Sequence, residues 1–141
     1  MEIKIKKSKP EVIIPAYAHH GDVGLDLRSL EDYEIKPGER YIFWLGFALE
    51  FPVGYAAIVK DKGGVAGNWG VHTTGGVFDA GYRGEYCVQL INLGQEIYKV
   101  EKGQKIAQLV ICPIAIVNLV ETDELSDSSR GHGRMGSTGK F

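Results

Sequence analysis

Short runs in which apolar and polar residues alternate are the feature that most restricts how this chain can fold. The runs are rich in Val, Ile, Tyr and Phe, and a period of two is typical of strands with one buried face. The strands that it predicts are Glu2–Lys6, Leu25–Arg28, Arg40–Phe43, Phe47–Glu50, Tyr55–Val59, Val71–Thr74, Glu85–Asn92, Tyr98–Val100, Ala107–Cys112 and Val117–Leu119. Glycine and proline turns separate these runs at short intervals, and the best helical candidate is the short Val65–Asn68. The pattern therefore predicts an all-β protein built as a sandwich, jelly roll or barrel.

Composition limits the number of domains and the kinds of partner. A chain of 141 residues is long enough for one domain with a substantial core and short for two. Its net charge of −2 argues against a broad basic surface for nucleic acid, although a local basic cluster can still hold phosphates. Its apolar runs are shorter than the roughly 18 residues of a membrane span, and its charged start lacks a signal-peptide core. We therefore expect a cytoplasmic protein without nucleic-acid or membrane partners, and we expect Cys87 and Cys112 to be buried thiols because both lie in apolar runs.

The C-terminal segment differs from the rest of the chain. Residues 126–141 are rich in glycine, serine and arginine and contain almost nothing to bury, so we expect a β domain over residues 1–125 followed by a mobile arm. Glycine exposes successive backbone N–H groups that can form an anion-binding nest, and arginine adds a bidentate fork for phosphate. The segment is therefore either a solvated, flexible end or an arm that closes over a polyphosphate.

Two segments combine acidic or aromatic side chains with glycine turns. In the hairpin expected over Gly75–Glu85, Asp79 either caps its own turn or polarises a water, and Tyr82 either covers the core or forms a flat wall for a sugar. Asp22 and Asp26 would share one face of a strand, since successive side chains alternate between faces. They are either a turn cap and an exposed acid, or a pair that orients waters on Mg²⁺, an ion that binds through few carboxylates plus substrate phosphates.

Two further segments carry groups that can bind phosphate. In Lys60–Ala66, lysines lie beside paired glycines just before the helical candidate, so the segment is either a solvated loop or a phosphate site at a helix start. Gln108 lies inside an apolar strand, where it either faces outward as a satisfied polar residue or donates its amide to a phosphate. Each of these signals is weak by itself.

The order and spacing of these segments carry more information than any one of them. Together they resemble the five ordered motifs of the trimeric dUTPase family, part of a superfamily that includes dCTP deaminase. Gly76–Glu85 is the most specific of the matching segments, and Gly103–Leu109 and Arg130–Gly139 also agree well. The resemblance implies a jelly-roll-like fold, also called a β-clip, and a homotrimer with an exchanged C-terminal arm and active sites at subunit interfaces. It also implies Mg²⁺-dependent hydrolysis of dUTP to dUMP and pyrophosphate, by in-line attack of water on the α-phosphate.

The resemblance also suggests a role for individual residues. Asp79 matches the family's carboxylate that activates the attacking water, and Tyr82 matches the aromatic that packs on the deoxyribose and excludes a 2′-hydroxyl. Asp26 matches the acid that contacts Mg²⁺ through water. The positions that match substrate contacts are Lys62, Gly63, Gly64, Gly76, Val77, Phe78, Tyr82, Gln108, Arg130, Met135, Gly136, Ser137 and Thr138.

The chain departs from the family pattern in ways that leave other functions open. Lys62, Gly63 and Gly64 stand where the family has Arg-Ser-(Ser/Gly), so a point charge replaces a fork and one hydroxyl is missing. Met135 replaces the aromatic lid over the base. The alternatives are a related hydrolase with another base preference and a weakly active nucleotide-binding or regulatory protein. Deamination is disfavoured, because Gln89 occupies the place of the deaminase general base and cannot take a proton.

Overall fold

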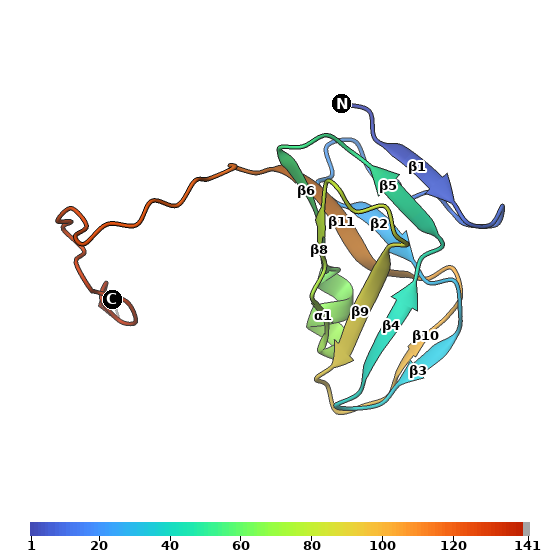
Figure 1. Ribbon diagram of the computed structural model, residues 1–141. Helices are drawn as coiled ribbons and strands as arrows, with labels where there is room; N and C mark the ends of the chain where they lie inside the picture. The colour runs from blue at the N-terminus through green and yellow to red at the C-terminus, as the bar shows by residue number, and fades with distance from the viewer. Residues whose placement is uncertain (140–141) are drawn as a thin grey trace.

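The computed structural model describes residues 1–139 as antiparallel strands with one short helix (Figure 1). In chain order the elements are β1 (Lys4–Lys7), β2 (Leu25–Arg28), β3 (Tyr33–Ile35), β4 (Arg40–Trp44), β5 (Phe47–Glu50), β6 (Tyr55–Asp61), α1 (Gly63–Trp69), β7 (Val71–Thr74), β8 (Val77–Asp79), β9 (Cys87–Asn92), β10 (Tyr98–Val100) and β11 (Lys105–Pro113). The burial of β9 shows why such runs form strands. Val88 and Leu90 face the core, whereas Gln89 between them is half-buried.

The strands described form four sheets around a shared core. The two larger sheets have the orders β2-β11-β6-β8 and β4-β9-β7, and β1 pairs with β5 and β10 with β3. Every pairing is antiparallel. One apolar cluster includes Leu27 and Leu109 from the first sheet and Phe43 and Val88 from the second, so the two sheets bury a common interior. The predicted all-β jelly roll is confirmed.

The alternating pattern by itself misses two strands and predicts one that does not form. β3 and β8, of three residues each, are too short to show alternation. The strand expected over Val117–Leu119 is wrong, because residues 114–120 form no strand. Val117 and Leu119 are 71% and 90% exposed, and the chain leaves the body after β11 (Figure 1). This segment has no neighbouring strand within residues 1–139 to pair with. A strand needs such a partner to form hydrogen bonds with its backbone groups.

The helix extends slightly further than the sequence indicates. α1 contains the expected Val65–Asn68 and ends at Gly70, whose φ of +66° places it in the left-handed region and whose N–H donates to the carbonyl of Ala66 (3.0 Å). Lys62 precedes the helix without a side-chain cap. Because glycine is a poor helix former, the helix depends on its packing against β7.

The two cysteines are free and only half-buried, so the expectation of buried thiols is wrong. Cys87 is on the outer face of its strand, next to the buried Val88, where the alternation of β9 turns it away from the core. Among residues 1–139, no helix is long and apolar enough to cross a membrane.

Candidate active site

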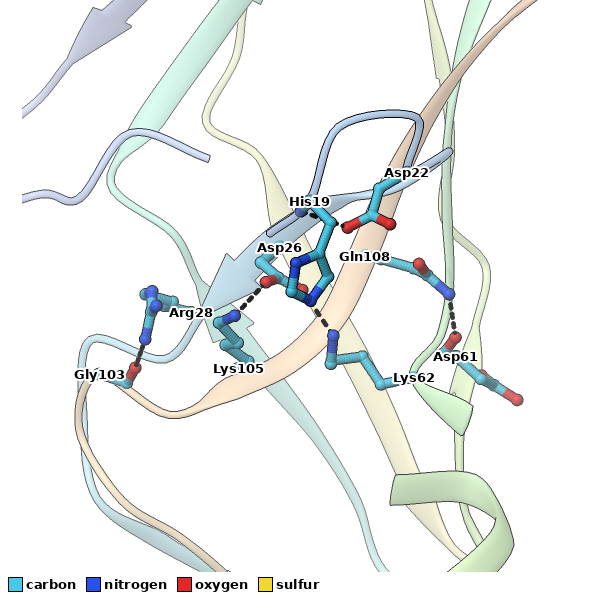
Figure 2. Close-up of polar contacts among 9 residues, drawn as sticks. All are labelled: His19, Asp22, Asp26, Arg28, Asp61, Lys62, Gly103, Lys105 and Gln108. Atoms are coloured by element: carbon cyan, nitrogen blue, oxygen red, sulfur yellow. Dashed lines mark hydrogen bonds and ion pairs between the residues drawn. The ribbon is translucent and has the colours of Figure 1, made fainter. Parts of the chain in front are cut away.

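A cluster of charged side chains gathers where β2, β6 and β11 lie side by side. Asp26 is almost completely buried, with a side chain that is 8% exposed. The Nζ of Lys62 lies 2.5 Å from its Oδ1, and the Nζ of Lys105 lies 2.5 Å from its Oδ2 (Figure 2). Two ammonium groups share one carboxylate, so these three side chains together carry an excess of one positive charge. The alternative that Asp26 is an exposed acid is wrong.

The electrostatics of the cluster keep Asp26 ionised. Burial raises the pKa of its carboxyl, but the hydrogen bonds and charges of Lys105 and Lys62 outweigh that effect, and the pKa lies below its ordinary value. Lys62 and Lys105 remain partly exposed, at 30% and 37% of their side chains. An anion from solvent can therefore reach the two ammonium groups.

Gln108 lies in β11, directly opposite Asp26 on one side and Lys60 on the other. Its Nε2 donates to the backbone carbonyl of Asp61 (2.7 Å), and an amide nitrogen has a second hydrogen to donate. Gly24 packs against this side chain: a Cβ on Gly24 would lie 2.2 Å from Oε1 of Gln108. Glycine at position 24 is therefore what lets Gln108 take this conformation.

The segment after β6 adds backbone donors to the cluster. The first intrahelical bond of α1 runs from the N–H of Ala66 to the carbonyl of Lys62 (2.9 Å). Gly63 and Gly64 come before that bond and are exposed, and the N–H groups of a first helical turn have no intrahelical acceptor. Asp22 is not part of this cluster; its Oδ2 accepts the N–H of His19 (2.8 Å), which confirms the turn cap.

A second group of candidate residues lies on β8 and the turn that follows it. Asp79 pairs with Ala56, near the start of β6. Lys62 follows the other end of β6, six residues after Ala56. At the rise of a strand the two positions are about 20 Å apart. One chain therefore does not bring the Asp79 group and the Asp26 cluster together.

Asp79 is exposed, and its carboxylate has no hydrogen-bond partner among residues 1–139, so the side chain does not cap its turn. The turn is closed instead by the backbone, with the N–H of Tyr82 donating to the carbonyl of Asp79 (3.0 Å). The hydroxyl of Tyr82 donates to the carbonyl of Glu85 (3.0 Å). Its ring lies 5.6 Å from that of Phe78, and the residue remains 38% exposed in the turn that follows Asp79.

β8 also presents an open backbone edge. It is the last strand of its sheet, so one side of Val77–Asp79 has no strand neighbour among the residues described. The carbonyl of Gly76 accepts the N–H of Val59 (2.7 Å), and a Cβ on Gly76 would lie 3.0 Å from that of Val59. Glycine at position 76 therefore allows the backbone just before β8 to approach Val59 of β6 closely, and this contact holds the edge strand in position.

The C-terminal arm lies far from both groups in this chain (Figure 1). Its hydrogen bonds are internal: Nε of Arg130 donates to the carbonyl of Gly133 (3.0 Å), a terminal guanidinium nitrogen reaches Oγ of Ser137 (3.4 Å), and this Oγ reaches the carbonyl of Arg134 (3.2 Å). Met135, Gly136 and Thr138 are exposed in the same coil. Lys140 and Phe141 lie outside the described residues.

Two residues of the Asp26 cluster were not singled out by the sequence. Lys105 lies in a recognisable segment, but only the pairing of β11 with β2 shows that it reaches Asp26. Asp61 had the appearance of a loop charge, yet its carboxylate accepts hydrogen bonds from Thr73. The missing signal is long-range strand pairing, which local sequence does not report.

An antiparallel β body with a solvent-accessible surplus of ammonium groups beside exposed glycine N–H groups suits a phosphate-bearing ligand. Separately, the open strand edge has unpaired backbone donors and acceptors, and Tyr82 is a partly exposed aromatic residue. Fold and site therefore define a small β protein that binds an organic phosphate.

The comparisons with known proteins name the family. The dUTPase family model matches residues 10–139. The deoxyuridine 5′-triphosphate nucleotidohydrolases of Nautilia profundicola and Clostridium tetani are 44% and 46% identical to this chain, over 99% and 98% of it and 100% and 97% of the relatives. The dUTPase of Staphylococcus bacteriophage 80alpha, solved with dUpNHpp, matches with a TM-score of 0.92 at 26% identity over 98% of each chain. The chain belongs to the dUTPase family, as the resemblance of its motifs predicted.

Proposed function

We propose that this chain hydrolyses dUTP to dUMP and pyrophosphate. The curated relatives carry that activity in their name, and the phage dUTPase was solved with the dUTP analogue dUpNHpp. The observation that carries the mechanism is the exposed Asp79 carboxylate, which has no protein partner among residues 1–139 and lies in the same turn as the 38% exposed Tyr82. A free carboxylate at the sugar side of a nucleotide can orient and deprotonate a water aimed at the innermost phosphorus.

The remaining candidate residues act by binding and by neutralising charge. Tyr82 packs on the deoxyribose, and the backbone of residues 76–78 reads the edge of the base. Lys62, the N–H groups of Gly63 and Gly64, and the amide of Gln108 hold the phosphates. Positive charge and aligned donors stabilise the charge that develops as water attacks. The arm, with Arg130, Met135, Gly136, Ser137 and Thr138, closes over the bound nucleotide and excludes bulk water.

Mg²⁺ is the cofactor that this function implies, and the site fits it only through water. Among residues 1–139, no three acidic, histidine or cysteine side chains gather closely enough to form a metal cage. Lysines lie against both oxygens of Asp26, which leaves no room for direct coordination. Oδ2 is buried from solvent and lies 2.5 Å from Nζ of Lys105, so a water on Mg²⁺ would reach this carboxylate only if Lys105 moved aside. When bound, the ion would neutralise phosphate charge and fix one triphosphate geometry.

The same separation of groups supports a homotrimer. Asp79 and the Asp26 cluster lie about 20 Å apart along β6 in one chain. They form one site only if Asp79 of one copy faces the Asp26 cluster of another copy. The arm contacts neither group in its own chain, so a third copy can supply it. Leu119 and Val120 are 90% and 78% exposed. These apolar side chains would be buried if residues 114–125, which precede the arm, packed against a neighbouring copy. We propose the cytoplasm as the compartment of this assembly.

Two departures from the family pattern favour a second candidate, a hydrolase that accepts a different deoxynucleoside triphosphate. Gly63 offers no hydroxyl to the phosphates, and Met135 stacks on a base less strongly than an aromatic does. The first change weakens a contact to the phosphates, which all these nucleotides share, and the second weakens a contact to the base, which is the part that differs among them.

A panel of deoxynucleoside triphosphates, assayed for release of pyrophosphate and of ammonia with and without Mg²⁺, tests the proposal. We expect Mg²⁺-dependent pyrophosphate from dUTP, without ammonia from dCTP. Asp79→Asn should lower kcat by about 10²-fold or more, the scale for a positioned general base, with unchanged thermal stability. Full turnover by Asp79→Asn would remove Asp79 from the mechanism, and preference for another triphosphate would select the second candidate.

A further inference from the structure

Asp61, the last residue of β6, joins the two larger sheets through its side chain. Its Oδ1 accepts both the N–H and the hydroxyl of Thr73, at 2.6 Å each, and its Oδ2 lies 2.8 Å from Nδ1 of His72. Thr73 and His72 belong to β7, which lies in the other sheet. These contacts determine where the end of β6 lies relative to β7.

The backbone around Asp61 joins the same point to the charged cluster. Its carbonyl accepts the amide of Gln108 (2.7 Å), as Figure 2 shows, and the next residue, Lys62, pairs with Asp26. The carbonyl of Lys62 in turn accepts the first intrahelical bond of α1, from Ala66. The groups proposed to hold phosphate are Lys62, the two glycines that begin α1 and Gln108 of β11, and all of them are therefore connected to the residue that β7 anchors.

The charge of Asp61 has the wrong sign for a residue beside bound phosphates. Burial raises the pKa of its carboxyl, but the hydrogen bonds from Thr73 and the contact with His72 outweigh burial, and the pKa lies below its ordinary value. An ionised carboxylate repels a triphosphate, so electrostatic attraction cannot be the reason for an aspartate here. The hydrogen bonds to β7 supply the reason, since they need an acceptor with two oxygens.

We propose that Asp61 is a positioning residue for phosphate binding. Through Thr73 and His72 it holds Lys62 and the Gln108 amide where a triphosphate meets them, without touching the substrate itself. The inference rests on the proposed function, which assigns the Asp26 cluster to the phosphates.

Steady-state kinetics with dUTP on Asp61→Ala and Asp61→Asn test this role. Asp61→Ala should raise KM roughly tenfold, the scale for losing charge-assisted hydrogen bonds, while kcat changes less. Asp61→Asn keeps one carbonyl oxygen for Thr73 and should recover part of the loss. If Asp61 acted only by repelling phosphate, both substitutions would instead lower KM, because each removes a negative charge.

Glu34→Gln is the matched control. It removes a negative charge from the exposed pair with Lys99 (2.8 Å) in the β3–β10 sheet and should leave both kinetic constants unchanged. Urea unfolding of each variant separates positioning from support of the fold. Reduced stability with an unchanged KM for the folded Asp61→Ala enzyme overturns the inference. If Asp61→Ala fails to fold, Thr73→Val, which removes one donor from the same carboxylate, should still raise KM, and an unchanged KM there also overturns it.

Lys62→Met distinguishes failure of this inference from failure of the site assignment. An increased KM for Lys62→Met with an unchanged KM for Asp61→Ala refutes the positioning role alone. An unchanged KM for Lys62→Met refutes the phosphate site and the positioning role together.

Discussion

Replacing Gly24 by alanine should disturb the candidate phosphate site by steric means alone. A Cβ on Gly24 would lie 2.2 Å from Oε1 and 2.9 Å from Cβ of Gln108. Gly24 lies outside the left-handed region, so alanine there creates no backbone strain of its own. The clash must be relieved by moving Gln108, whose amide then loses its 2.7 Å hydrogen bond to the carbonyl of Asp61.

Two effects determine the size of the loss in stability. Overpacking a filled site costs about 1–3 kcal/mol, and losing one neutral hydrogen bond costs about 1 kcal/mol. Gly24→Ala should therefore lower the free energy of unfolding by about 2–4 kcal/mol. At roughly 2–4 °C per kcal/mol for a domain of this size, Tm should fall by roughly 4–16 °C. The displaced amide should also raise KM for dUTP, because Gln108 is a proposed phosphate contact.

Urea unfolding of Gly24→Ala, Gln108→Ala and the double variant, all at one protein concentration, measures the effect as a double-mutant cycle. Gln108→Ala removes Oε1 from the clash but leaves Cβ, so it should restore part of the stability lost in Gly24→Ala, with a coupling of about 1–2 kcal/mol. Gly67→Ala is the control, because nothing lies within 4 Å of its added Cβ and alanine favours a helix by up to about 1 kcal/mol. Strictly additive losses, or a Gly24→Ala protein as stable as wild type, would refute the reasoning.

Three further predictions concern the arm, the sugar wall and acid stability. Deleting residues 130–141 should leave the body folded, since the arm's hydrogen bonds are internal, but should lower dUTP turnover about tenfold or more; full turnover would contradict the clamp. Because Tyr82 is proposed to exclude a 2′-hydroxyl, kcat/KM for UTP should be about 10²-fold below that for dUTP, and equal values would exclude that role. The pKa of Asp26 is lowered on folding, so its contribution to stability is complete above the unfolded value of 3.8 and is lost as pH falls through the lower folded value. Urea unfolding across this acid range should show a weaker pH dependence for Asp26→Asn than for wild type, and parallel curves would be the contrary result.

Local sequence was enough to predict most of the strands. The limits predicted for β2, β5, β7 and β10 coincide with the structure, because alternation and flanking turns are properties of neighbouring residues. The same rule failed over Val117–Leu119, where the alternation is present but no partner strand exists among residues 1–139. A strand depends on its neighbour as much as on its own sequence.

Candidate residues could also be identified from sequence, but their partners could not. Asp26 was open to interpretation as an exposed acid, yet β11 brings Lys105 to its second oxygen and β6 brings Lys62 to its first. Asp61 gave no local sign that it bridges two sheets through Thr73. Contacts between residues distant in the chain depend on strand register, which is determined by packing of the whole body.

The sequence by itself determined an all-β architecture, a separate glycine-rich C-terminal segment and membership of the dUTPase family, because alternation, composition and motif order are written along the chain. Only the tertiary structure decided that the Asp79 group and the Asp26 cluster lie at different ends of β6. It also decided that two lysines share the buried carboxylate of Asp26. The reason is that strand pairing fixes the distances between positions along the chain. Groups attached to opposite ends of one extended strand stay far apart within one chain, and only a second copy can bring them together.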